Sequence, residues 1–200
     1  MQTEPHVVIV GGGFSGAAVA IHLLRLAPTG VRVTLLEPRE VPGAGVAYST
    51  TEPSHRINVP AARMQLAGEE EGEFDRWYRS QPAFADDPQA LLEDGAVYPQ
   101  RGQFGRYVAQ RFAEKARASG GRLTHLREQA LRFEDGEIIT DGGHRLRPIC
   151  WCWPSAIRRP LCRRWRRRSR PIRRSSLTPG ERACWTLSRR RRASRSWAPA

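Results

Sequence analysis

The sequence lacks any hydrophobic stretch long enough to cross a membrane, since no run approaches the roughly 18 to 20 apolar residues that a spanning helix needs. The first residues also lack the basic segment, apolar core and cleavage site of a secretory signal. We therefore predict a cytoplasmic protein without a membrane partner.

Cysteine is absent from residues 1–149. The four cysteines lie in the C-terminal part of the chain, at Cys150, Cys152, Cys162 and Cys184. Their spacing matches neither a zinc-binding pattern nor a disulfide framework. The sequence therefore predicts no metal site.

Acidic residues are nearly absent from residues 145–200, which hold 18 arginines and the single acid Glu181. Residues 1–144 hold 15 basic and 19 acidic residues, so the net charge of +13 comes entirely from the C-terminal part. Taken over the whole chain, such a charge would indicate a nucleic-acid binder. Because the positive charge is confined to one end, it indicates instead that the chain has two parts of different composition.

The N-terminal part contains a glycine-rich turn between a predicted strand and a predicted helix. Residues 7–10 are four apolar residues in succession, as in a strand covered on both faces, and apolar residues at helical spacing follow the turn. Gly11, Gly13 and Gly16 occupy the G-x-G-x-x-G positions of a dinucleotide-binding turn. A helix that starts there presents free backbone N–H groups and a positive dipole end to a phosphate.

An acidic residue completes this pattern. A second apolar run, residues 31–36, ends at Glu37, which lies 21 residues beyond Gly16. A carboxylate at the tip of the second strand accepts hydrogen bonds from the ribose hydroxyls of an adenine dinucleotide and disfavours a 2′-phosphate. The turn and the acid leave FAD and NAD(H) open as the cofactor.

Hydrophobic periodicity predicts the remaining elements. One helix is expected after the acidic run 69–73, with Phe74, Trp77 and Tyr78 in the core. Two more are expected over residues 88–92 and 103–118. The expected strands span 123–126, 130–133 and 137–140. Residues 38–49 are predicted to form a loop rich in proline and glycine. The mixed segment 55–64 fits neither period and is a candidate to line a site.

Three histidines are candidates for catalysis. His22 lies within the first predicted helix, where we expect it on the outer face, and His125 lies in a predicted strand. Both are interpreted as structural residues, and only His55 lies in a candidate site loop. The sequence does not identify a catalytic acid, base or nucleophile.

The motifs together resemble a known family. VVIVGGGFSGAAVAIHLLR, VTLLEPRE, PGAGVAYST, HRINVPAARM, FDRWYR and YPQRGQFGRYV resemble, in this order, FAD/NAD(P)-binding proteins, and among them the FAD-dependent urate hydroxylase and aspartate N-monooxygenase-like enzymes. The resemblance implies an α/β fold with a Rossmann-type, three-layer FAD/NAD(P)-binding domain. It also implies that FAD is the cofactor, that NAD(P)H is the reductant and that a small polar molecule is oxygenated.

The resemblance further implies which residues hold FAD. The glycine turn and Glu37 would bind the pyrophosphate and ribose, the two loops after it would lie along the flavin, and Gln129 and Ala130 would offer backbone contacts to the adenine side. The implied cofactor-binding residues are Gly11, Gly13, Phe14, Ser15, Gly16, Glu37, Pro38, Gly45, Ala47, Asn58, Val59, Met64, Gln129 and Ala130.

The family pattern stops near Arg147. Residues 1–147 are therefore interpreted as the N-terminal part of the domain, and residues 148–200 as a disordered basic tail that leaves the domain incomplete. The strand expected to lie beside residues 7–10 is missing, which predicts an unpaired sheet edge there and a chain that binds FAD weakly and is not a competent monooxygenase.

The genetic code suggests why the family pattern stops near residue 147. Cysteine is encoded by TGT or TGC and tryptophan by TGG. If the codons of residues 150–154 are read from their third base, the translation is Leu-Val-Leu-Ala, which is the apolar run that the missing strand requires. We interpret the tail as the product of a reading-frame shift between about residues 145 and 148. The alternatives are an NAD-dependent dehydrogenase or an arginine-rich nucleic-acid binder with Trp165 as a stacking residue, although we expect no nucleic-acid partner.

Overall fold

The computed structural model describes residues 4–27, 29–67 and 71–148 and the backbone of residues 150–152. The chain divides into two units, Met1–Ser155 and Ala156–Ala200, and all described residues belong to the first. The predictions made for residues 153–200, including the basic tail and Trp165, lie outside the described residues.

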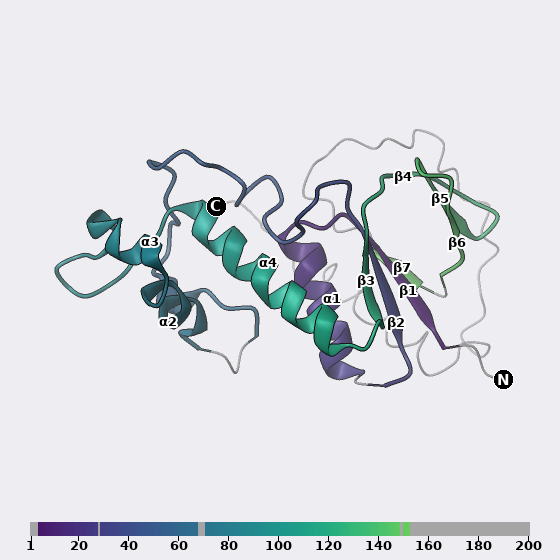
Figure 1. Cartoon of the computed structure of the whole chain (residues 1–200), viewed down its shortest axis with the longest axis horizontal. Helices are drawn as coiled ribbons and strands as arrows, with labels where there is room; N and C mark the ends of the chain where they lie inside the picture. The colour runs from purple at the N-terminus through teal and green to yellow at the C-terminus, as the bar shows by residue number, and fades with distance from the viewer. Residues whose placement is uncertain (1–3, 28, 68–70, 149, 153–200) are drawn as a thin grey trace, which may run out of the picture. The chain divides into compact units, whose positions relative to one another are not determined.

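A parallel sheet forms the centre of the described unit (Figure 1). It contains β1 (His6–Val10), β2 (Arg32–Leu36), β3 (Leu123–Leu126) and β7 (Cys150–Cys152), in the order β3-β2-β1-β7. Val10 is the register partner of Leu36, which in turn pairs with Leu126. The carboxyl ends of the first three strands therefore meet at one edge, as the predicted Rossmann-type α/β fold requires.

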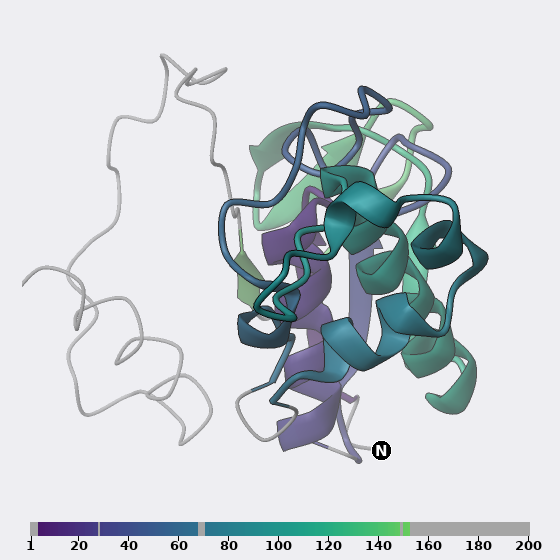
Figure 2. The same cartoon turned by 90° about the vertical axis from the view of Figure 1, so that its left-hand side faces the viewer.

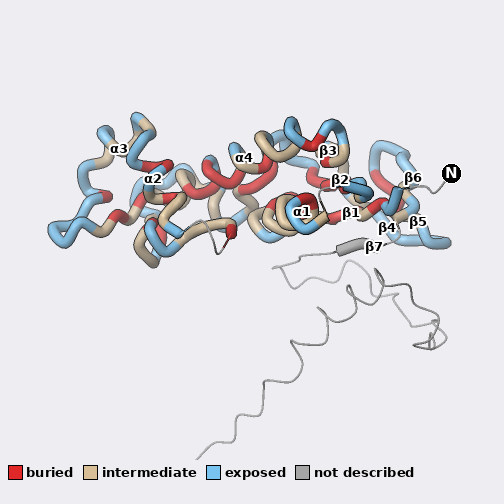
Figure 3. The backbone as a smooth tube through the Cα atoms, turned by 90° about the horizontal axis from the view of Figure 1, so that it is seen from below, coloured by how far each residue is buried: buried red, intermediate tan, exposed pale blue. Residues whose placement is uncertain are grey.

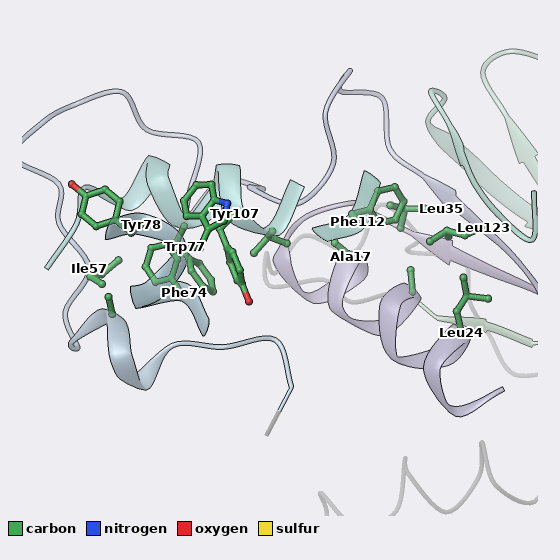
Figure 4. Packing of buried hydrophobic residues seen from close by; sticks show 14 of the residues in the cluster. Ala17, Leu24, Leu35, Ile57, Phe74, Trp77, Tyr78, Tyr107, Phe112 and Leu123 are labelled. Atoms are coloured by element: carbon green, nitrogen blue, oxygen red, sulfur yellow. The ribbon is translucent and has the colours of Figure 1, made fainter. Parts of the chain in front are cut away.

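Helices α1 (Phe14–Leu26) and α4 (Arg101–Ala118) pack against one face of this sheet. Leu24 of α1 and Phe112 of α4 share a buried cluster with Leu35 and Leu123 of the sheet (Figure 4). Burial of each such side chain contributes roughly 1.5–3 kcal/mol. The apolar stripes predicted for both helices are thus confirmed.

An aromatic cluster occupies the N-terminal half of α4. Helix α2 (Glu73–Arg79) packs there with α3 (Pro82–Ala85) as its neighbour (Figure 2), and Phe74, Trp77 and Tyr78 are buried, as predicted. The ring centroids of Phe74 and Phe104 lie 4.9 Å apart. The predicted helix 88–92 is a single 3-10 turn, η2 (Pro88–Ala90), while α3 and the 3-10 turn η1 (Ala61–Arg63) carry no periodicity that would have predicted them.

An antiparallel sheet covers the other face of the parallel sheet. It consists of β4 (Ala130–Glu134), β5 (Glu137–Thr140) and β6 (Arg145–Leu146), and Ile138 packs against Val8 and Leu36. Figure 3 shows buried residues in the strands of the parallel sheet, along α1 and α4, and around α2. Helices, parallel sheet and antiparallel sheet make the three predicted layers.

The expectation of an unpaired edge at β1 is wrong. Residues 150–152 form β7, in which Cys150 and Cys152 are parallel register partners of Val7 and Ile9. Parallel pairing uses backbone N–H and C=O groups, so it does not require the apolar side chains that the family pattern has in this strand. The strand that the family pattern requires is therefore present, at the position where the alternative reading frame places its apolar run.

Candidate dinucleotide-binding site

The glycine turn joins β1 to α1 as its spacing predicts. The amide of Gly11, whose φ is +101°, donates to the carbonyl of Leu36 at 2.8 Å, and Gly13 is the N-cap of α1. A Cβ atom on Gly16 would collide with the carbonyl oxygen of Gly11. The helix can approach the end of β1 this closely only because residue 16 has no side chain.

The first turn of α1 offers unused hydrogen-bond donors. The amide of Ala17 donates to the carbonyl of Gly13 at 3.0 Å, but the amides of Phe14, Ser15 and Gly16 have no acceptor among the described residues. The first amides of a helix carry the positive end of its dipole. This turn can therefore bind the oxygen atoms of a phosphate group.

Glu37 lies beside this turn and is almost fully buried, with an exposed fraction of 5 %. Its Oε2 accepts a hydrogen bond from the amide of Gly12 at 2.7 Å, and its Oε1 accepts one from the amide of Arg39 at 3.1 Å. The guanidinium of Arg39 lies 3.8 Å from Oε1. Each carboxylate oxygen keeps a second lone pair for another donor, such as a hydroxyl group.

The backbone of Glu37 is held by β3. Its amide donates to the carbonyl of Leu126 at 3.2 Å, and its carbonyl oxygen lies 2.8 Å from Nε2 of His125. Because a carbonyl only accepts, His125 carries its proton on Nε2. His125 is thus a structural histidine, as predicted.

The loop after β2 also reaches the turn. The amide of Gly43 donates to the carbonyl of Gly12 at 2.7 Å, and a Cβ atom on Gly45 would lie 2.9 Å from Cα of Gly13. The structure therefore brings Gly45 to the turn, in keeping with the resemblance. Exposed Pro38 adjoins Glu37, and exposed Ala47 lies further along the same loop.

The second predicted loop is placed differently. The amides of Ile57 and Ala61 donate to Pro99 and Val97, which tie this segment to the aromatic end of α4. Within the described part of the chain, no hydrogen bond or ion pair joins Asn58, Val59 or Met64 to the glycine turn. Met64 instead packs against the main core.

Gln129 and Ala130 follow β3 at the edge of the sheet where the glycine turn lies. The amide of Gln129 donates to Oδ1 of Asp141 at 2.9 Å, and its carbonyl accepts from the amide of Asp141 at 3.0 Å. Ala130 begins β4 and pairs with Thr140. Both backbone carbonyl and amide of Gln129 are therefore engaged within the protein.

Two other histidines have partners outside this site. Nε2 of His22 lies 2.7 Å from the carbonyl oxygen of Leu66, and the side chain is half-buried, so the expectation that it lies on the outer face of α1 is wrong. Nδ1 of His55 lies 3.0 Å from Oγ1 of Thr50 on the surface. Neither contact involves the glycine turn.

Sequence patterns missed the role of α4 in supporting the site. A Cβ atom on Gly105 would collide with the carbonyl oxygen of Tyr48, and one on Gly102 would lie 2.9 Å from that of Thr50. The ring of Tyr48 in turn lies 5.9 Å from that of Phe14, the first residue of α1. Two glycines in an otherwise well-formed helix were the available signal of close backbone approach.

Other ligand sites are not apparent near the turn. Within the described ranges, no group of His, Cys, Asp or Glu residues could hold a metal ion, and no helix is both long and apolar enough to span a bilayer. A pocket of about 290 Å³ lies between α1 and α4. It is lined by Ile21, Arg25, Leu66, Ala67, Glu73, Arg111, Glu114, Lys115 and Ala118. It contains no residue of the turn, and it borders residues 68–70, which are not described, so we assign it no ligand.

Comparison with protein families identifies this arrangement. A family model described as FAD-NAD(P)-binding matches residues 8–146, which include the glycine turn, Glu37 and all three layers. The chain belongs to the FAD-NAD(P)-binding family. The resemblance of the motifs to FAD/NAD(P)-binding proteins is thus confirmed for the family. A comparison with curated proteins finds no match.

Three solved structures are similar to this chain at low identity. A flavin-containing monooxygenase from Stenotrophomonas maltophilia is 19 % identical, with 76 % of this chain and 37 % of that chain covered and a TM-score of 0.42. An open structure of cyclohexanone monooxygenase is 17 % identical, with 76 % and 27 % covered and a TM-score of 0.47. FqzB is 18 % identical, with 76 % and 37 % covered and a TM-score of 0.43. This member of the FAD-NAD(P)-binding family therefore spans well under half the length of these enzymes, and at such low identities no functional residue is transferred from them.

Proposed function

We propose that the glycine turn and Glu37 bind the pyrophosphate and the adenosine ribose of FAD. The observation that carries the proposal is the buried carboxylate of Glu37, 2.7 Å from the amide of Gly12, at the start of a helix with free amides. This arrangement provides donors for a phosphate and acceptors for a diol next to one another. The residues therefore fit an adenine dinucleotide.

Each group has a defined role in this proposal. The amides of Phe14, Ser15 and Gly16 donate to the pyrophosphate oxygens, and the dipole of α1 stabilises their negative charge. The free lone pairs of Glu37 accept hydrogen bonds from the ribose hydroxyls. A 2′-phosphate would bring like charge to a carboxylate that has almost no solvent contact, which disfavours NADP at this position.

Bound flavin would supply the redox chemistry, with NAD(P)H as the reductant, and the protein would bind, orient and shield it from water. We propose a flavin-dependent oxidoreductase resembling monooxygenases that act on a small polar molecule. On the resemblance alone, we also propose as cofactor contacts Gly11, Pro38, Gly45, Ala47, Asn58, Val59, Met64, Gln129 and Ala130. No side chain is proposed as an acid, base or nucleophile.

The test is a titration of the purified 200-residue chain with FAD, followed by flavin fluorescence. Gly13→Val places a side chain where the pyrophosphate should lie, and Glu37→Ala removes the ribose acceptor; each should weaken binding roughly tenfold to a hundredfold. Glu40→Ala is the matched control, because Glu40 is an exposed carboxylate on the same loop. Unchanged affinity in both site variants would refute the proposal, whereas binding of NADH without FAD would favour the NAD-dependent dehydrogenase.

For residues 148–200 we propose an out-of-frame sequence: its backbone still supplies β7, but the rest of the family pattern is lost, which leaves the enzyme incomplete and its cofactor affinity weak. Independent sequencing of the gene should reveal the shift near codons 145–148. An uninterrupted frame, with the tail detected by mass spectrometry, would contradict this proposal. Binding of RNA or DNA that weakens steeply with salt and disappears on deletion of the tail would instead support the nucleic-acid alternative.

A further inference from the structure

His125 makes a contact that neither the glycine turn nor the family pattern explains. It lies on β3 as the register partner of Leu35, yet its ring reaches past the end of β2 to the carbonyl of Glu37, at 2.8 Å. The two residues are 88 positions apart in the chain. A half-buried imidazole is thus aimed at the backbone of the proposed ribose acceptor.

Glu37 is fixed from several sides, and His125 supplies the only side-chain donor to its backbone within the described residues. The amide of Glu37 is held by Leu126, and the carboxylate is held by Gly12 and by the amide of Arg39. The carbonyl of Glu37 begins the loop that leaves the sheet. Without a donor there, the peptide group could rotate and carry the Cα–Cβ bond of Glu37 with it.

We propose that His125 is a positioning residue for cofactor binding, which it supports by holding Glu37 in the orientation that meets both the ribose and the amide of Gly12. This inference rests on the proposed function. It does not require His125 to touch the cofactor. Another hydrogen-bond donor of similar reach at position 125 should therefore maintain FAD affinity. Removal of the donor should lower FAD affinity only while Glu37 has a carboxylate to position.

The test is a double-mutant cycle on FAD affinity in the full chain. His125→Leu, which keeps the approximate volume and removes the donor, should weaken FAD binding roughly fivefold to tenfold. His125→Gln, which keeps an N–H donor at similar reach, should stay within about twofold of the wild type. In the Glu37→Ala background, His125→Leu should change the affinity by less than about twofold.

A cofactor-free measurement accompanies the cycle. The amide of Gly12 donates to Glu37, so His125→Leu should accelerate hydrogen exchange at Gly12 several-fold. His22→Leu is the matched control, because His22 also contacts a backbone carbonyl, that of Leu66, at 2.7 Å. It should leave both the exchange of Gly12 and the FAD affinity unchanged.

The outcomes separate the two proposals. If FAD binds and Glu37→Ala weakens it, but His125→Leu has the same effect in both backgrounds, His125 does not act through Glu37 and only the present inference fails. Unchanged exchange at Gly12 in His125→Leu would overturn it as well. If the wild type takes up no FAD, or Gly13→Val and Glu37→Ala both leave the affinity unchanged, the proposed function fails and the inference fails with it. Unchanged affinity in Glu37→Ala alone overturns the inference.

Discussion

The amide of Gly12 donates to the carboxylate of Glu37 at 2.7 Å, across 25 residues of sequence. This bond joins the glycine turn to the acid at the end of β2, so the position of one constrains the position of the other. A Cβ atom on Gly12 would lie 2.6 Å from Cβ of Glu37. The contact therefore depends on a glycine that is not one of the three in the G-x-G-x-x-G pattern.

Gly12→Ala should displace Glu37 and reduce the free energy of unfolding by about 1–3 kcal/mol, since an added methyl group has no room. Urea unfolding measures this loss, and FAD titration should show weaker binding. The comparison is Gly30→Ala, where no atom lies within 4 Å of the added Cβ and only the positive φ of +75° is unfavourable. That variant should keep its FAD affinity; equal FAD affinities in the two variants would contradict the steric account.

Gly105→Ala should destabilise the protein although alanine is the better helix former by about 1 kcal/mol. The added methyl group would collide with the carbonyl of Tyr48 and push the loop away from α4. Chemical denaturation should give a lower free energy of unfolding than in the wild type. An increase, as helix propensity alone predicts, would show that the loop adjusts without cost.

Arg56→Met should lower the free energy of unfolding by about 2 kcal/mol, because it leaves a partly buried carboxylate without its counter-charge. Arg56 and Asp87 are joined by two hydrogen bonds of 2.7 and 3.0 Å, and their side chains are 25 % and 11 % exposed. Arg132 and Glu134 form the exposed comparison, at 57 % and 54 %. Arg132→Met should cost less than about 0.5 kcal/mol, and equal losses would contradict a special role for the Arg56 pair.

Tyr78 should make stability fall at alkaline pH. Burial, aided by the charge and hydrogen bond of Asp87, raises the pKa of Tyr78 from 10.0 to about 12. Between these values the folded state retains a proton that the unfolded chain has lost, so stability decreases as the pH rises through this interval. Unfolding measured between about pH 9 and pH 11 should show a smaller decrease in Tyr78→Phe than in the wild type.

His6 should have the opposite effect at mildly acidic pH. Burial, followed by the charge of Arg32, lowers the pKa of His6 below 6.5, and its Nε2 lies 2.8 Å from Oγ1 of Thr34. The unfolded chain therefore takes up a proton before the folded state does, and stability is lost as the pH falls below that value. His6→Gln should lose less stability than the wild type between about pH 7.5 and pH 5.5; an equal loss would exclude this contribution.

Local patterns were sufficient for much of the fold. The apolar run of β1, the glycines that follow it and the acid at the end of β2 predicted the strand, the turn and the start of α1, because each pattern depends on backbone geometry within a few residues. The stripes of α1 and α4 predicted which faces are buried, for the same reason. The 3-10 turn η1 could not be predicted, since the amide of Ala61 donates to the distant carbonyl of Val97, and α3 is a four-residue turn too short to show a helical period.

The sequence by itself determined the glycine turn between β1 and α1 and the acid beside it, because a missing side chain and a carboxylate at fixed spacing leave few alternatives. Only the tertiary structure decided that β7 pairs with the edge of β1, that Gly105 allows the carbonyl of Tyr48 to approach α4, and that His125 contacts the carbonyl of Glu37. Each of these contacts joins residues far apart in the chain. No periodicity encodes them, and they arise only when the sheet and α4 bring their backbones together.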